Sequence, residues 1–131
     1  MNRRDEKPRQ SLVNKFRLAW RGLRRGVRSE SNFFVHLFMA ATVIAAAGVL
    51  GCTLTDWCLL VLCIAAVLAT EMLNTAMEHL AKAISEKRNP FIADALDMAS
   101  AGVLLASVGS AVVGTLILGN RLGLLLGWWQ A

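Results

Sequence analysis

Long apolar runs fill most of the chain after a basic N-terminal stretch. The three runs cover roughly residues 33–52, 57–84 and 92–118. Apolar residues that gather in runs of about 20, instead of in stripes, are typical of helices that cross a membrane. The second run is longer than a bilayer requires, so its last turns should emerge into the interface. The pattern predicts an all-α membrane protein with three transmembrane helices.

The stretch before the first run has the spacing of an amphipathic helix. Leu12, Phe16, Trp20, Leu23 and Val27 share one helical face. Most of the other positions are basic, namely Lys15, Arg17, Arg21, Arg24, Arg25 and Arg28. A basic amphipathic helix of this kind suits the membrane interface, with Trp20 at headgroup depth.

Composition and charge agree with this interpretation. The chain is 56% hydrophobic and 18% charged, and the two kinds of residue are segregated. The formal net charge is +5, and ten of the fourteen Lys and Arg residues lie between Arg3 and Arg28. A basic block can bind nucleic acid, but this one adjoins a hydrophobic span. Attraction to anionic lipid headgroups is the better interpretation, and no nucleic acid partner is expected.

The positions of Lys and Arg also predict the topology. The connection between the second and third runs holds Lys82, Lys87 and Arg88, whereas the first connection holds no basic residue. The C-terminal segment holds only Arg121. Because Lys and Arg accumulate on the cytoplasmic side, we expect the N-terminus inside and the C-terminus outside.

The third run carries small residues at every fourth position, which allows helices to approach closely in lipid and makes a homo-oligomer plausible. Those positions are Gly102, Ala106, Ser110 and Gly114. Gly119, Asn120 and Gly123 are expected to break the helix. We therefore divide the chain into a disordered cytoplasmic tail (1–11), a membrane domain (12–119) and a C-terminal tail (120–131).

The second run contains polar side chains where a spanning helix ordinarily has none. Glu71 and Glu78 are two helical turns apart, about 10 Å along one face, with Asn74 between them. An ionisable residue within a span is a functional-site hypothesis by default. The expected topology also brings Glu30 and Asp97 to the cytoplasmic face, so we expect the four acids to form one site.

Four converging carboxylates would repel one another unless they held a cation. Mg²⁺ typically binds one or two carboxylates together with substrate phosphates. The deeper Glu71 would suit a base for a hydroxyl at headgroup depth, and the shallower Glu78 a metal ligand. Phosphoryl transfer needs little beyond positioning, charge neutralisation and a base, although no standard nucleotide-binding loop is present. A proton- or cation-coupled transporter with Glu71 as carrier, and a structural acid cluster, are the alternatives.

Several motifs resemble the bacterial membrane-integral diacylglycerol kinase family, which includes undecaprenol kinases. Residues 71–78, Glu-Met-Leu-Asn-Thr-Ala-Met-Glu, are similar to the family signature Glu-x-x-Asn-Ser/Thr-Ala-x-Glu. Residues 95–105 are similar to a second block that usually begins Ala-Lys-Asp. Residues 20–23 and 30–36 match the amphipathic helix and the segment after it. The resemblance covers about residues 16–118.

The resemblance implies a homotrimer in the bacterial inner membrane, with active sites between protomers on the cytoplasmic side. It implies transfer of the γ-phosphate of MgATP to a lipid alcohol, either diacylglycerol or undecaprenol. The site residues it implies are Glu71 as catalytic base, Glu30 and Glu78 as ligands of the metal and nucleotide, Asn74 in support, and Leu96 and Asp97 at the nucleotide.

The chain departs from the family pattern at three positions. Leu96 replaces the usual lysine, Lys82 stands where an acid is common, and Leu18 replaces an aromatic residue. We hypothesise that Lys82, Lys87 or Arg88 restores the missing positive charge; a catalytically inactive membrane sensor is the alternative.

Two further residues bear on the choice of lipid. Asn32 and His36 are more similar to the undecaprenol kinase branch. A lone histidine near the end of a span is otherwise more often a structural hydrogen-bonding residue than a ligand.

Overall fold

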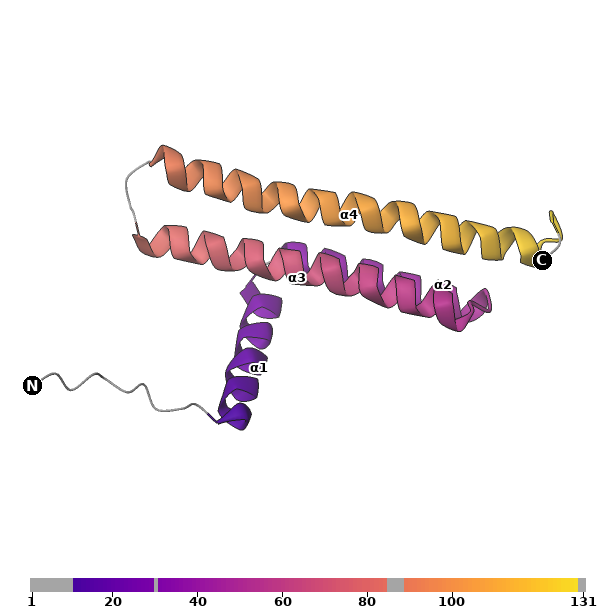
Figure 1. The fold of residues 1–131 in the computed structure, drawn as a ribbon, viewed down its shortest axis with the longest axis horizontal. Helices are drawn as coiled ribbons and strands as arrows, with labels where there is room; N and C mark the ends of the chain where they lie inside the picture. The colour runs from indigo at the N-terminus through magenta and orange to yellow at the C-terminus, as the bar shows by residue number, and fades with distance from the viewer. Residues whose placement is uncertain (1–10, 30, 85–88, 130–131) are drawn as a thin grey trace, which may run out of the picture.

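The chain is all-helical in the regions that the computed structural model describes, which are residues 11–29, 31–84 and 89–129 (Figure 1). This agrees with the predicted fold class. The elements are α1 (Leu12–Ser29), α2 (Ser31–Val49), α3 (Leu54–Ile84) and α4 (Pro90–Leu125). In lipid only helices and closed barrels satisfy their own backbone polar groups, which is why apolar runs of this length become helices.

Two of the helices can cross a bilayer by length and composition alone. α3 and α4 reach mean hydropathies of 2.0 and 2.1. α1 and α2 pass the same test only as a pair, bent by 98° between them. The structure therefore contains two clear spans, and a third, as the sequence predicts, if the bent pair is counted.

α3 and α4 form an antiparallel hairpin along their whole length (Figure 1). Polar contacts define the register of the hairpin at three levels along its axis. They join Ser100 Oγ to Asn74 Oδ1 (3.3 Å), Ser110 Oγ to the Cys63 carbonyl oxygen (3.3 Å) and Arg121 Nε to Asp56 Oδ2 (2.6 Å). Such contacts exclude a slip of the two helices, because a shift of one turn would separate all three pairs.

The first residues of α3 and α4 have the chemistry of helix starts. Thr53 and Asp56 form a reciprocal capping box, in which each backbone N–H donates to the other side chain, at 2.9 and 3.4 Å. Asn89 caps α4 by accepting from the N–H of Phe91 at 3.0 Å, and Pro90 occupies the first turn. Gly51 supplies the positive φ, 64°, of the turn between α2 and α3.

The expected break of the last helix at Gly119, Asn120 and Gly123 is wrong, because α4 continues to Leu125. Each glycine within a helix costs about 1 kcal/mol relative to alanine. The residues just after the helix fold back on this segment: Asn120 Oδ1 accepts from Trp129 Nε1 at 3.1 Å. The Trp129 ring also lies where a Cβ on Gly123 would be, so this glycine is a packing position and not a helix breaker.

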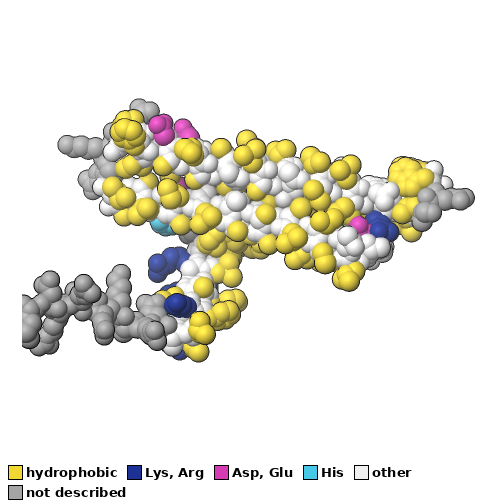
Figure 2. Space-filling view, in the orientation of Figure 1, with side chains coloured by type: hydrophobic (Ala, Val, Ile, Leu, Met, Phe, Trp, Pro, Cys, Tyr) yellow, Lys and Arg dark blue, Asp and Glu magenta, His cyan; other side chains and the backbone are white. Residues whose placement is uncertain are grey.

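α1 has three different faces. Its apolar face is open, with Leu12 83% and Phe16 74% exposed, as expected for a helix that inserts into the interface. A third face approaches α3, where the Met72 sulfur and methyl group would have to move to admit a Cβ at Gly26. Figure 2 shows basic side chains on the side of α1 opposite its hydrophobic ones. This arrangement fits the predicted amphipathic helix.

The contact between α1 and α3 also indicates where the membrane edge lies. Met72 is 18 residues beyond Leu54, the first residue of α3, which corresponds to about 27 Å of helix. That length is close to the hydrocarbon thickness of a bilayer, about 30 Å. An interfacial α1 therefore places Glu71 near one edge of the bilayer, and the last turns of α3 beyond it.

Candidate active site

The most buried polar side chains of the described chain lie together on α3. Glu71 is only 3% exposed, and Asn74 and Thr75 are also buried. Most large apolar side chains, by contrast, face outward, as they do when lipid is the solvent. Burying a carboxylate is expensive unless another group compensates for it, so the neighbours of Glu71 are informative.

The neighbour of Glu71 comes from α2. His36 Nε2 lies 3.7 Å from Glu71 Oε2, and the two side chains are 22% and 5% exposed. This distance is within ion-pair range but slightly longer than a hydrogen bond. The pair joins two helices at the level where the membrane edge is expected.

Asn74 and Glu78 form a second pair one turn further along α3. Asn74 Nδ2 donates to Glu78 Oε1 at 3.1 Å, while Asn74 Oδ1 accepts from the Ser100 hydroxyl at 3.3 Å. Asn74 therefore uses both ends of its amide and fixes the Glu78 carboxylate relative to α4. This geometry fits the supporting role expected for Asn74. Ser100 is a site neighbour that the sequence did not single out, because its partner lies 26 positions away.

The remaining predicted residues are less closely gathered. Asp97 is one turn before Ser100 on α4, hence at the same end as Glu78, but it is exposed. Leu96 is half-buried beside it. Figure 2 shows the acidic side chains of α4 on the surface at this end. Glu30 lies outside the described residues.

The described acids do not form a closed metal site. Across residues 11–29, 31–84 and 89–129, no three His, Cys, Asp or Glu side chains gather closely enough to hold an ion. No hydrogen bond or ion pair between described residues joins Asp97 to Glu71 or Glu78. Glu71, Glu78 and Asp97 therefore lie at the same end of the α3–α4 hairpin, as expected, but they do not form a cluster.

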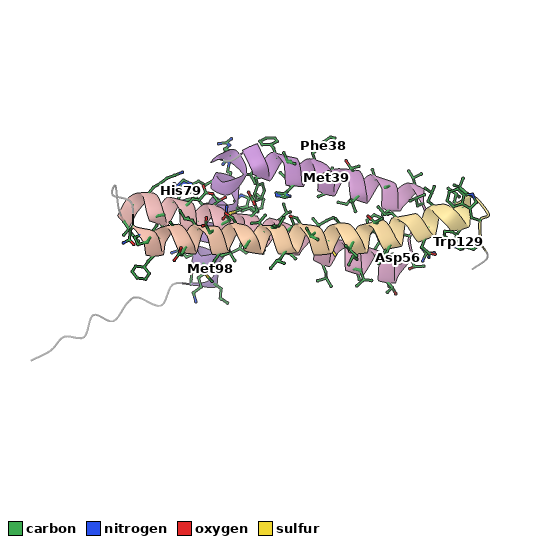
Figure 3. The ribbon with its side chains drawn as sticks, turned by 90° about the horizontal axis from the view of Figure 1, so that it is seen from above. Phe38, Met39, Asp56, His79, Met98 and Trp129 are labelled. Carbon is green, nitrogen blue, oxygen red and sulfur yellow. The ribbon has the colours of Figure 1, made fainter. Side chains whose placement is uncertain are left out.

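An apolar groove reaches His36, the residue that contacts Glu71. It holds about 410 Å³ between α2, α3 and α4, and its lining includes Val35, His36, Met39, Leu60, Val67 and Ser107. Figure 3 shows Met39 on the inner side of α2, with Phe38 pointing away. The Ser107 hydroxyl is the one buried side-chain polar atom without a partner in the described chain. The groove has the chemistry of a site for an aliphatic chain, with polar groups near one end.

A second hollow lies on the other side of α3, against α1. It holds about 530 Å³ and is lined by Gly22, Arg25, Gly26, Thr75 and His79, among others. Further arginines, Arg21, Arg24 and Arg28, border a neighbouring hollow with Arg25. Among the described residues, none of these arginines has an acidic partner. Unpaired guanidinium groups at a membrane edge suit phosphate groups, whether of lipids or of a nucleotide.

Fold and site together define a class: a helical membrane protein with a buried carboxylate beside a histidine that lines an apolar groove. Comparison with known proteins identifies the family. Residues 17–118 match the family described as prokaryotic diacylglycerol kinase, and the chain belongs to that family. The resemblance seen in the motifs is therefore confirmed.

Individual relatives support a lipid kinase of this family. The chain is 30% identical to an undecaprenol kinase of Bacillus subtilis, over 86% of this chain and 95% of the relative. It is 31% identical to a diacylglycerol kinase of Synechocystis, over 82% of this chain and 62% of the relative. It is 30% identical to a diacylglycerol kinase of Haemophilus influenzae, over 72% and 80%. No solved structure gives a significant match.

Proposed function

We propose that the protein transfers the γ-phosphate of MgATP to the hydroxyl of a membrane lipid alcohol. One observation carries the proposal: the buried Glu71 lies beside His36, and His36 lines a mostly apolar groove between α2, α3 and α4. A lipid alcohol can enter such a groove laterally from the bilayer and present its hydroxyl at headgroup depth. A nucleotide can approach the same level from the aqueous side.

Glu71 is the base in this proposal. Its carboxylate takes the proton of the lipid hydroxyl as the lipid oxygen bonds to the γ-phosphorus. The bond from that phosphorus to the β–γ bridging oxygen breaks, and ADP leaves. A base of this kind contributes about 10²-fold to 10⁴-fold to a rate.

Glu78 is the proposed metal ligand, together with Glu30. The fit is reasonable, because Glu78 offers hard carboxylate oxygens and Asn74 holds one of them in place. Mg²⁺, when bound there, would neutralise charge on the phosphates. Asp97 and Leu96, at the same end of the hairpin, are proposed to contact the nucleotide. The described acids of one chain do not gather closely enough to hold an ion by themselves, so we propose a site shared between protomers.

The missing lysine at Leu96 leaves the phosphates without one expected cation. Lys82 is exposed in the last turn of α3 and is a candidate replacement. The other two candidates, Lys87 and Arg88, lie outside the described residues. If alanine at none of the three positions weakens ATP binding, the compensation proposal is wrong.

Undecaprenol is our first choice of lipid and diacylglycerol the second. His36, which sequence similarity associates with the undecaprenol kinase branch, lies beside the proposed base. The match to the undecaprenol kinase also covers more of both chains than the other two matches do. We further propose a homotrimer in the bacterial inner membrane with the N-terminus in the cytoplasm, which would cover part of the exposed apolar surface of α4.

A direct test is phosphorylation of a panel of lipid alcohols by the purified protein in bilayers, with labelled ATP and Mg²⁺. We expect labelled lipid from the wild type and none from Glu71→Gln. If no lipid is labelled, while vesicles show a cation flux that depends on Glu71, the protein is a transporter and not a kinase.

A further inference from the structure

The contact between His36 and Glu71 has no role yet in the proposed reaction. His36 belongs to α2 and Glu71 to α3, and their closest atoms, Nε2 and Oε2, are 3.7 Å apart. Among the described residues, no side chain donates a hydrogen bond to the Glu71 carboxylate. His36 is also the only described residue with a nitrogen able to carry charge within 4 Å of it. Among the described residues, His36 is therefore the side chain best placed to orient this buried carboxylate.

Packing alone does not require a histidine at this position. α2 carries fully buried apolar residues of its own, Phe33 (1% exposed) and Ala47 (0% exposed), one near each end of the helix. The His36 side chain is partly exposed and borders the apolar groove. It thus lies between the groove and the carboxylate, where an arriving hydroxyl would pass.

We propose that His36 is the positioning residue for Glu71, an inference that rests on the proposed kinase reaction. Its Nε2–H donates to Glu71 Oε2 and leaves Oε1 free to accept the proton of the lipid hydroxyl. The pair needs to close by less than about 1 Å to form this hydrogen bond, and catalytic hydrogen bonds commonly shorten when substrate binds. When one carboxylate oxygen of Glu71 is fixed, the other oxygen points toward the lipid hydroxyl in a larger fraction of conformations.

Kinetics of two substitutions test the proposal. His36→Leu should lower kcat for lipid phosphorylation by about 10-fold to 100-fold, the usual loss when an orienting partner is removed. The KM for ATP should change less than about 2-fold, because the nucleotide lies at other residues. His36→Gln should recover most of the rate, because its amide nitrogen can donate to the same carboxylate oxygen.

A matched control is Phe38→Leu, two positions along α2, where the side chain is exposed and points away from the groove. It should behave as wild type. Equal rates for His36→Leu and wild type would overturn the proposal. So would equal losses in His36→Leu and His36→Gln at unchanged melting temperature, because then the hydrogen bond is not what matters.

A measurement without activity separates this proposal from the kinase proposal. The chain has two histidines, so ring ¹⁵N signals of labelled protein can be assigned with His36→Leu. Glu71→Gln should shift the His36 signals and leave those of His79 unchanged, since His79 is two turns away on α3. If His36 does not respond, the positioning role is wrong whatever the enzyme does. If it responds in a protein that phosphorylates no lipid, the contact stands and the kinase proposal fails.

Discussion

Both ends of the α3–α4 hairpin carry acidic residues, but among the described residues an arginine pairs with an acid at only one end. At the far end, Arg121 pairs with Asp56 at 2.6 Å and also donates to the Thr53 hydroxyl at 3.1 Å (Figure 2). At the near end, no Lys or Arg of the described chain pairs with Glu71, Glu78 or Asp97. A network in which every charge is paired and hydrogen-bonded specifies structure, whereas acids without a Lys or Arg partner at a membrane edge can bind a charged ligand. This contrast separates the structural end from the functional end.

Among these substitutions, Glu71→Gln should have the largest effect on lipid phosphorylation. It should reduce lipid phosphorylation by at least about 10²-fold, because the amide cannot take a proton. The melting temperature should not fall, because the change removes a buried carboxylate that has no Lys or Arg partner among the described residues, and the glutamine oxygen can still accept from His36. Lipid phosphorylation and thermal unfolding in the same detergent measure both effects. A protein that loses activity only because it melts earlier would contradict the functional assignment of this end.

Glu78→Gln should act through the metal. We expect about 10-fold to 100-fold lower activity at limiting Mg²⁺, with partial recovery at higher Mg²⁺, because one hard oxygen ligand is weakened. A Mg²⁺ titration of lipid phosphorylation measures this. Thr70→Val, on the same helix but hydrogen-bonded only to its own backbone, is the control. Identical Mg²⁺ curves for Glu78→Gln and wild type would remove Glu78 from the metal site.

Asp56→Asn should show the opposite behaviour. It weakens the pair with Arg121 and the capping box of α3, and should lower the free energy of unfolding measurably. The activity per folded molecule should change little, since this end lies across the bilayer from Glu71. Denaturant titration alongside the lipid assay separates the two quantities. A loss of kcat without loss of stability would show that the two ends are coupled.

The smallest effect concerns the side of the membrane on which each end lies. Burial raises the pKa of the Cys52 thiol, Asp56 raises it further, and Arg121 opposes the increase. An impermeant maleimide added outside intact cells should therefore label Cys52 slowly, and faster as the pH rises, because the thiolate is the reactive form.

A second introduced cysteine provides a matched control for the proposed topology. In a variant with serine at the three native cysteine positions, Lys82→Cys introduces a thiol at the other end of α3. That thiol should react only after the membrane is opened. If it is labelled from outside in intact cells and Cys52 is not, the N-terminus faces outward.

Much of the architecture follows from local pattern. The helices, the amphipathic face of α1 and the spacing of Glu71, Asn74 and Glu78 depend on residues a few positions apart, so hydropathy and helical periodicity predict them. The error at Gly119 and Gly123 has the same origin: local propensity predicts a break, but α4 continues to Leu125 and the Trp129 ring packs on Gly123.

Contacts between residues that are distant in the chain could be identified only from the tertiary structure. His36 meets Glu71, Ser100 meets Asn74, and Arg121 meets Asp56 across 65 positions. A bilayer requires each spanning helix to satisfy its own backbone, so sequence alone determines that the helices form. It does not determine their register, because the surrounding lipid is as apolar as the side chains, and only close packing and a few polar contacts between helices select one alignment.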